Sequence, residues 1–231
     1  MNRGSVVGLI HGCTQGPTGW MKLQEHLSDR GIASTAVNLE PAQLNESGAV
    51  ECAQEITRQL GDVDRLILVS TSCSGLLAPV VATMRPVERL VFVCAGLPDI
   101  GRSATSQIAE DGVLHRDWMK VDFDPDDLET AKHYMFHDCP DENLQWSIST
   151  GRLLLPPQVY DDVTPLVSWP DVPITYVLGA KDRVIRPDWA RATVPVRLGV
   201  EPIEIDTGHC PQNSQPEVLA GILAEAVVSV G

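Results

Sequence analysis

Three residues of this 231-residue chain carry the side chains of a nucleophile, an acid and a base, and each comes shortly after an apolar run. They are Ser72, Asp182 and His209. A serine hydroxyl is a weak nucleophile and needs a base within hydrogen-bond reach. An imidazole serves as that base when a carboxylate on its other nitrogen orients it. These residue types indicate acyl transfer through a serine nucleophile.

The segment around Ser72 has the pattern of a nucleophile elbow, the sharp strand-to-helix turn that lifts a nucleophile above a sheet. Such a turn needs small residues two before and two or three after the nucleophile, and Ser70, Ser74 and Gly75 meet this need. Serines replace both glycines of the G-x-S-x-G consensus, so a second register, with Cys73 as the nucleophile, is also sterically possible, and a thiol is the stronger nucleophile. The apolar run ends where the Ser72 register requires, which favours Ser72.

Two other carboxylates compete with Asp182 for the role of the orienting acid. Asp206 lies three residues before His209, and Asp99 follows the fourth apolar run. Each candidate alone also has an ordinary structural explanation, as a turn, a cap or a buried histidine at a strand end. Because serine, aspartate and histidine occur in that order on three separate strand-end loops, we interpret Ser72, Asp182 and His209 as a catalytic triad.

Hydrolysis also requires hydrogen-bond donors for the developing oxyanion. The backbone N–H of Cys73, beside the nucleophile, and that of Cys13, which follows a His-Gly pair, are the predicted donors. Four cysteines, including Cys94 and Cys210, are then expected around the site and predict sensitivity to bulky thiol reagents. The six cysteines have no C-x-x-C spacing, so we expect reduced thiols rather than disulfides or a metal framework.

Strand-like and helix-like stretches alternate along most of the chain, which predicts a parallel α/β sheet flanked by helices. In such a sheet the ligand site lies beyond the carboxyl ends of the strands. The predicted strands are 6–10, 34–37, 65–69, 90–94, 174–178 and 202–205, and the predicted helices are 20–30, 49–60, 75–84, 187–192 and 215–228.

One long segment, 97–170, interrupts this alternation with helix-like, aromatic-containing patches and no strand of comparable strength. Long irregular insertions are uncommon in compact domains, so we expect a helical cap inserted into a core formed by 1–96 and 171–231. A cap over the strand ends would form the walls of a pocket. Trp118 and Trp146 from the cap, and His11 from the first strand-end loop, are the candidate pocket residues.

The composition excludes several classes of partner. A formal net charge of −14 argues against binding to nucleic acid or to an anionic membrane surface. No segment approaches the roughly 20 apolar residues of a membrane span, and the apolar stretch at 6–10 is too short for a signal peptide. We therefore expect a cytoplasmic protein with a small-molecule substrate; the oligomeric state is left open.

Four motifs, in their order along the chain, resemble those of the α/β-hydrolase fold superfamily. They are His-Gly at 11–12, the elbow at 70–75, Gly-Ala-Lys-Asp at 179–182 and Gly-His at 208–209. The elbow is similar to the His-Ser-Gly-Ala-Gly elbows of actinobacterial α/β hydrolases, with Thr71 where those proteins have histidine. The resemblance implies an α/β-hydrolase fold with a mostly parallel sheet of about six strands and a helical cap. It also implies a serine esterase that cleaves an ester, lactone or thioester of a small apolar molecule through an acyl-enzyme.

Two alternative functions use the same residues. Ser70 and Thr71 add hydroxyls near the site, which leaves open a carbon–carbon lyase or cyclase that uses the triad as acid and base without an acyl-enzyme. A ligand-binding receptor is the other alternative. Aspartate-nucleophile members of the superfamily are excluded because neither register places a carboxylate at the elbow. No nucleotide cofactor is expected, since the first loop lacks the G-x-G-x-x-G spacing, and we interpret His133 and His137 as a solvated pair rather than metal ligands.

Overall fold

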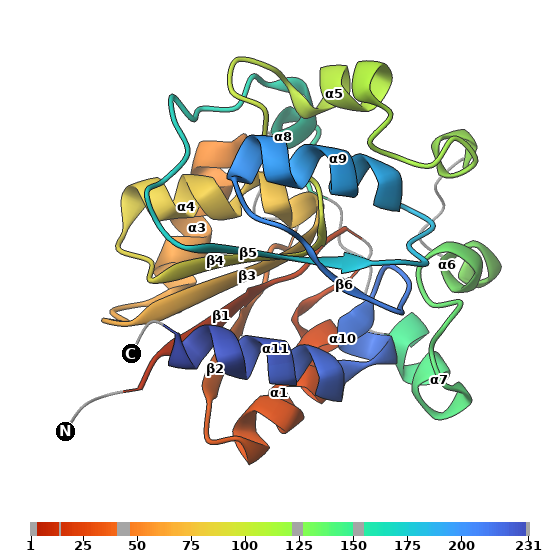
Figure 1. Ribbon diagram of the computed structural model, residues 1–231, viewed down its shortest axis with the longest axis horizontal. Helices are drawn as coiled ribbons and strands as arrows, with labels where there is room; N and C mark the ends of the chain where they lie inside the picture. Colours follow the sequence, from red (N-terminus) through yellow and green to blue (C-terminus); the bar gives the residue numbers. More distant parts are fainter. Residues whose placement is uncertain (1–3, 14, 41–46, 122–126, 150–154, 230–231) are drawn as a thin grey trace.

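A parallel sheet forms the centre of the computed structural model, which describes residues 4–13, 15–40, 47–121, 127–149 and 155–229. Within these residues six strands pair side by side, all parallel, in the order β2-β1-β3-β4-β5-β6 (Figure 1). This arrangement confirms the predicted fold class. The strands are β1 (Val6–Ile10), β2 (Ala33–Val37), β3 (Leu66–Ser72), β4 (Arg89–Ala95), β5 (Ile174–Gly179) and β6 (Ile203–Ile205).

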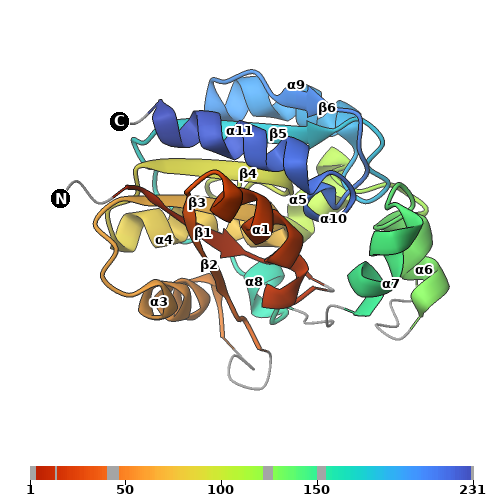
Figure 2. The same cartoon turned by 90° about the horizontal axis from the view of Figure 1, so that it is seen from below.

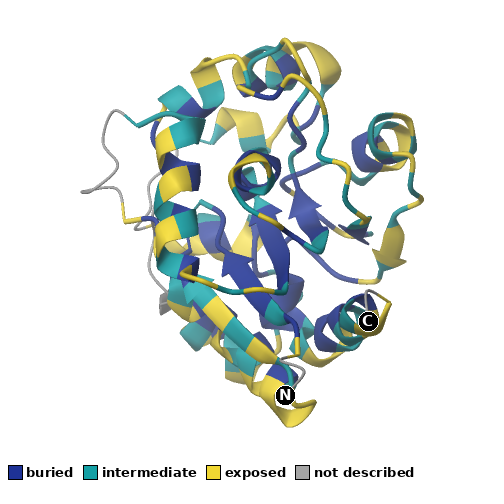
Figure 3. Cartoon of the chain, turned by 90° about the vertical axis from the view of Figure 1, so that its left-hand side faces the viewer, coloured by how far each residue is buried: buried dark blue, intermediate teal, exposed yellow. Residues whose placement is uncertain are grey.

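Helices cover both faces of the sheet. On one face α1 (Met21–Asp29) and α11 (Pro216–Val228) pack against each other, and on the other face lie α3 (Ala49–Leu60), α4 (Ala78–Met84) and α9 (Pro187–Leu198) (Figures 1 and 2). The four inner strands, β1, β3, β4 and β5, are largely buried between the two layers (Figure 3), whereas the edge strands β2 and β6 are mostly exposed or half-buried. Burial on both faces explains why the inner strands are continuous apolar runs in the sequence. No helix of the described residues is both long and apolar enough to cross a bilayer.

The segment between β4 and β5 contains helices and, in its described part, no strand of the sheet. Figure 2 shows that two of its helices, α6 and α7, lie beyond the carboxyl edge of the sheet. The helical elements of this segment are α5 (Ala104–Asp111), the 3-10 turn η3 (Trp118–Lys120), α6 (Leu128–Tyr134), α7 (Asp141–Ser149) and α8 (Gln158–Asp161). This is the segment predicted as a cap.

Strand β3 extends three residues beyond its predicted end at Val69. It continues because its pairing with β4 persists through a bulge, so that Ser72 lies beside Ala95. The chain then forms a short 3-10 turn, η2 (Cys73–Leu76), before α4 begins, whereas one helix over 75–84 was expected. Proline in the first turn of α4 explains the late start, because a proline N–H is not required there.

Helix α9 is twice as long as the predicted stretch 187–192. It continues through Pro195 to Leu198 and ends where Gly199 adopts a left-handed backbone with φ of 68°. Glycine is the residue best suited to that conformation after a helix. The internal proline, which normally opposes a helix, therefore does not mark its end.

Candidate active site

The turn after β3 is strained at one residue, Ser72. Its φ of 55° and ψ of −129° place its backbone in a region that residues other than glycine rarely adopt. Cys73, the alternative nucleophile, begins the 3-10 turn η2 with no positive φ. The elbow geometry is therefore centred on Ser72, with the backbone N–H of the next residue at the start of a turn of helix.

Two glycines allow the backbone to pass close to this elbow. A Cβ added at Gly75 would collide with the carbonyl oxygen of Gly96, and one added at Gly12 would lie 2.6 Å from the Cβ of Ser72. No other residue fits either place without displacement of the elbow. Gly12 thus brings the loop after β1 directly against Ser72.

The serine at position 74, where the consensus has glycine, stabilises the elbow. Its Oγ accepts a hydrogen bond from the N–H of Thr71 (3.0 Å) and lies 3.0 Å from the carbonyl oxygen of Ile10, to which it donates. The side chain is fully buried. A hydroxyl therefore links the ends of β1 and β3, a role that a glycine could not fill.

Asp182 and His209 form a buried acid–base pair on the loops that follow β5 and β6. The Nδ1–H of His209 donates to Oδ2 of Asp182 at 2.8 Å, and the residues are 1% and 3% exposed. The other carboxylate oxygen accepts from the backbone N–H groups of Val184 (2.7 Å) and Ile185 (3.0 Å). Because both oxygens of Asp182 are occupied, the carboxylate holds the imidazole in one orientation.

The Nε2 atom of His209 is buried and has no hydrogen-bond partner among the residues that the structure describes. With Nδ1 protonated and bound to the carboxylate, Nε2 carries the lone pair and is the acceptor of the imidazole. An unsatisfied buried acceptor is rare in folded proteins and is a common feature of catalytic sites. The pair therefore has the arrangement that a general base requires: a fixed imidazole with an available acceptor nitrogen.

The two competing carboxylates have other partners. Asp206 is 76% exposed in its side chain and pairs with Lys181 Nζ at 2.8 Å. Asp99 pairs with Arg102 (3.1 Å) and Arg197 (3.4 Å). Only Asp182 among these three acids is hydrogen-bonded to His209 in the described part of the chain.

One of the two predicted oxyanion donors, the backbone N–H of Cys13, is engaged by a neighbouring side chain. The backbone N–H of Cys13 donates to the sulfur of Cys73 at 2.9 Å, and the two sulfurs are also 2.9 Å apart. The sulfur of Cys13 lies 2.7 Å from the hydroxyl of Tyr160 on α8. The Cys73 side chain thus occupies a donor that the sequence assigned to a substrate oxyanion.

A cavity of about 310 Å³ opens at Ser72 and is walled mainly by apolar side chains. Its walls come from the elbow, the loop after β1, the segment between β4 and β5, and the loop after β5. The lining residues are Cys13, Ser72, Cys73, Leu76, Gly96, Leu97, Ala104, Gln107, Ile108, Val113, Leu114, Trp118, Tyr160, Val184 and Ile185.

Of the three predicted pocket residues, one lines this cavity. Trp118 is part of the wall, whereas Trp146 lies on α7 outside the lining. His11 is 1% exposed, and its Nε2 accepts the N–H of Leu39 at 3.1 Å. Burial lowers the pKa of His11 to about 4, so the ring is neutral and supports the loop after β1 from within the core.

The segment predicted as a cap is bonded to both loops of the acid–base pair. Asp138, just after α6, accepts hydrogen bonds at Oδ2 from the N–H of Gly208 (2.6 Å) and the hydroxyl of Thr207 (2.8 Å). His137 Nε2 lies 3.1 Å from the carbonyl oxygen of Lys181. The sequence did not identify Asp138, because nothing in its local pattern indicates a contact across 70 residues.

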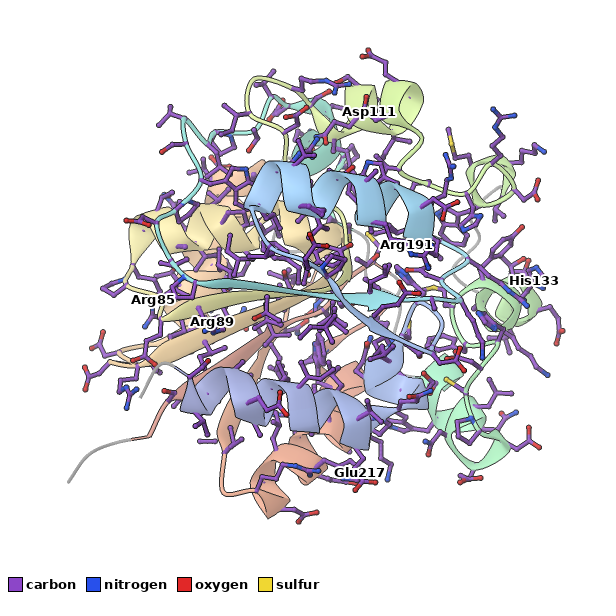
Figure 4. The ribbon with its side chains drawn as sticks, in the orientation of Figure 1. Arg85, Arg89, Asp111, His133, Arg191 and Glu217 are labelled. Atoms are coloured by element: carbon purple, nitrogen blue, oxygen red, sulfur yellow. The ribbon has the colours of Figure 1, made fainter. Side chains whose placement is uncertain are left out.

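His133 makes a further contact of the same kind. It lies on α6 beyond the carboxyl edge of the sheet (Figure 4), and its carbonyl oxygen accepts from Arg183 Nη1 at 2.9 Å. The two histidines considered as metal ligands therefore both contact the loop after β5.

Buried amide side chains connect the loop after β1 to the residues that follow His209. Gln15 Nε2 donates to Oδ1 of Asn213 at 2.9 Å, and Gln212 Nε2 donates to Oε1 of Gln15 at 2.8 Å. All three side chains are at most 2% exposed. This network holds the loop after β1 and the base loop in a defined relation, and sequence patterns gave no sign of it.

The family model described as the alpha/beta hydrolase family matches residues 9–222. Methylesterase 17 of Arabidopsis thaliana is 23% identical over 96% of this chain and 91% of its own length. Methylesterase 4 of the same plant is 31% identical, over 39% of each protein. Two solved structures have the same fold over 97% of the chain. A polyneuridine aldehyde esterase has a TM-score of 0.81 and 17% identity and is covered over 99% of its length. A pyrethroid hydrolase of Sphingobium faniae JZ-2 has a TM-score of 0.77 and 19% identity and is covered over 98%.

Proposed function

Because this chain belongs to the alpha/beta hydrolase family, we propose that it is a serine esterase that cleaves a small, largely apolar ester through an acyl-enzyme on Ser72. One observation carries the proposal: a buried Asp182–His209 pair whose Nε2 has no partner, in a fold whose strained elbow presents a serine to an apolar cavity. The names of the relatives, methylesterases and hydrolases among them, support an ester bond, and lactones and thioesters share its chemistry.

The reaction would proceed in two steps. The hydroxyl of Ser72 attacks the ester carbonyl while Nε2 of His209 takes its proton, and Asp182 stabilises the imidazolium that forms. The imidazolium then protonates the leaving alcohol, and the acyl group stays on the serine. A water molecule, activated by the same imidazole, hydrolyses the acyl-enzyme and regenerates the free hydroxyl.

The oxyanion of each tetrahedral intermediate would be bound by the backbone N–H groups of Cys73 and Cys13. The Cys13 donor is engaged by the Cys73 sulfur in the structure. A rotation of the Cys73 side chain about χ1 would free that donor. The proposed mechanism requires this rotation before the oxyanion forms.

The walls of the cavity indicate the substrate class. About 310 Å³ of mainly apolar space suits a molecule with few polar atoms beyond its ester group. The segment 97–170 supplies Leu97, Ile108, Trp118 and Tyr160 to these walls. We propose that it acts as the cap of this enzyme and determines which acyl and alcohol groups fit.

Hydrolysis of a series of short-chain p-nitrophenyl esters tests the proposal, with mass spectrometry to locate the acyl adduct. We expect turnover by the wild-type protein, an adduct on Ser72, and a loss of at least about 10³-fold in Ser72→Ala. Wild-type turnover by Ser72→Ala, in a protein shown to be folded by circular dichroism, would contradict the proposal. An adduct on Cys73 would overturn the assignment of the nucleophile.

The lyase or cyclase alternative finds less support in the structure. It was motivated by the hydroxyls of Ser70 and Thr71, but both residues are at most 2% exposed and neither is part of the cavity lining. Ester hydrolysis, which requires only groups that border the cavity or lie in the acid–base pair, is therefore the reaction that we propose.

A further inference from the structure

Two cysteines that are 60 residues apart in the chain meet at the wall of the active-site cavity. Cys13 follows β1 and Cys73 follows β3, and their sulfurs are 2.9 Å apart. Both residues are part of the cavity lining, and both are partly exposed. A small reagent that enters the cavity can therefore reach this thiol pair.

The two thiols have different chemical characters. The thiol of Cys73 donates a hydrogen bond to the sulfur of Cys13, and this bond, helped by those from the Leu155 backbone and the Tyr160 hydroxyl, lowers the pKa of Cys13 to about 7. Burial raises the pKa of Cys73. Cys13 is thus the sulfur that becomes a thiolate near neutral pH, and Cys73 keeps its proton until it reacts.

We propose that Cys13 and Cys73 are a reversible redox-modification site, at which a hydroperoxide joins them in a disulfide that closes the oxyanion hole. The two sulfurs must approach by about 0.9 Å to reach the length of a disulfide, roughly 2.05 Å.

The oxidation balances with hydrogen peroxide as the oxidant. The Cys13 thiolate attacks one peroxide oxygen, the O–O bond breaks, and the sulfur becomes a sulfenic acid while the other oxygen leaves as water after protonation. The Cys73 sulfur then attacks the Cys13 sulfur and loses its proton, and the sulfenic oxygen leaves as a second water. Two thiols and one peroxide thus give one disulfide and two waters, and an external dithiol reverses the change.

The bond would stop hydrolysis because of where it holds the Cys73 sulfur. That sulfur accepts the backbone N–H of Cys13, the predicted second oxyanion donor. As a thiol the side chain can rotate away, but as half of a disulfide it cannot. Loss of one oxyanion donor lowers kcat by about 10²- to 10³-fold in serine hydrolases. This inhibitory part of the inference rests on the proposed function, whereas the formation of the disulfide does not.

The experiment compares the full-length protein after treatment with hydrogen peroxide and after treatment with dithiothreitol. Peptide mapping without reduction should find the peptides of Cys13 and Cys73 linked. Hydrolysis of p-nitrophenyl acetate should fall about 100-fold in the oxidised protein and return with dithiothreitol. The rate of oxidation should rise about tenfold from pH 6 to pH 8, as Cys13 becomes a thiolate.

Three variants complete the test. Cys52→Ala removes a thiol on the buried face of α3, and this variant should form the Cys13–Cys73 link as the wild type does. Cys13→Ser and Cys73→Ser should form no link. Peroxide should cause no loss of activity in either variant that dithiothreitol then reverses. The activity of each oxidised variant is compared with that of the same variant in its reduced form. Thermal unfolding confirms that each variant is folded.

The outcomes separate the two proposals. Absence of the Cys13–Cys73 link in folded, peroxide-treated wild-type protein overturns the redox site. A complete link with unchanged hydrolysis overturns the inhibition. If the reduced protein hydrolyses no ester, the proposed function fails, and peptide mapping still decides whether the disulfide forms.

Discussion

The two halves of the candidate site are in different states. On the acid–base side, Asp182 and His209 are bonded to each other and almost completely buried. On the nucleophile side, Ser72 has a strained backbone, and the Cys13 N–H is bonded to the Cys73 sulfur. Under the proposed function, the first half is already assembled, whereas the second requires a rotation of the Cys73 side chain first.

The difference has a physical cause in how each half is supported. Backbone N–H groups fix Asp182, and Asp138 fixes the loop of His209 through two further hydrogen bonds. The thiols on the nucleophile side are weak donors and acceptors, so their arrangement costs little to change. The acid–base pair is therefore preorganised, whereas the side chains of Cys13 and Cys73 can change their arrangement.

The largest expected effect follows from breaking the assembled half. Asp182→Asn should lower kcat on the order of 10³- to 10⁴-fold, because an amide at this place no longer selects the tautomer with a free Nε2. The matched control is Asp206→Asn, an exposed aspartate near His209 in sequence that pairs with Lys181, and it should retain near wild-type kcat. Ester kinetics measure both. A larger loss in the Asp206 variant would reverse the assignment of the acid.

A smaller effect is expected from the residue that positions the base loop. Asp138→Ala removes the acceptor of the Thr207 and Gly208 hydrogen bonds, and we expect kcat to fall about 10- to 100-fold with KM nearly unchanged. Asp141→Ala, an exposed acid on the first turn of α7, is the control. A change confined to KM would show that Asp138 acts on substrate binding instead.

His11 is one of the buried side chains that support the nucleophile half, and we expect its removal to change stability rather than rate. Folding lowers its pKa from 6.5 to about 4, so between these values the unfolded chain binds more protons. Stability from this residue is complete above pH 6.5 and falls as the pH drops toward 4. The loss between pH 7 and pH 4.5 should be about 2.5 kcal/mol.

Urea unfolding at the two pH values measures this loss. His11→Gln should lack this part of the difference between pH 7 and pH 4.5, whereas His26→Gln, on the surface helix α1, should retain it. If the free energy of unfolding depends on pH equally in the wild type and in His11→Gln, His11 is not the cause of the loss.

A general rule of parallel sheets explains why Asp182 and His209 could be expected near each other. Both follow apolar strands, and in a parallel sheet all strand ends of one kind meet at one edge. The structure places a hydrogen bond of 2.8 Å between them. The contact between Cys13 and Cys73 depends on register: β1 and β3 pair Ile10 with Ser70, so each cysteine lies three residues beyond a matched pair. Periodic patterns identify strands but do not align them, so the sequence predicted that both cysteines lie at the site but did not predict the contact between their sulfurs.

The contacts that the segment between β4 and β5 makes with the site could not be predicted from the sequence either. Asp138 and Tyr160 reach the site from positions without periodic signal, and only the folded chain brings them there. Trp118 and Trp146 were equivalent as aromatic residues in that segment, yet the structure places only Trp118 at the cavity. Composition identifies which residues are suited to a wall, but it does not tell which of them face it.

The last and smallest effect separates these two tryptophans. Trp118→Ala removes an aromatic wall that also packs edge-on against Tyr134, with ring centroids 5.2 Å apart. We expect KM for a p-nitrophenyl ester to rise about fivefold, which corresponds to about 1 kcal/mol of lost apolar contact, with kcat nearly unchanged. Trp146→Ala should leave both constants near the wild-type values, because its side chain is not part of the cavity lining. Equal increases in KM would mean that substrate contacts both tryptophans and that the segment between β4 and β5 changes its arrangement on binding. A decrease in kcat with KM unchanged would mean that Trp118, like the Cys73 side chain, must move before the oxyanion can be bound.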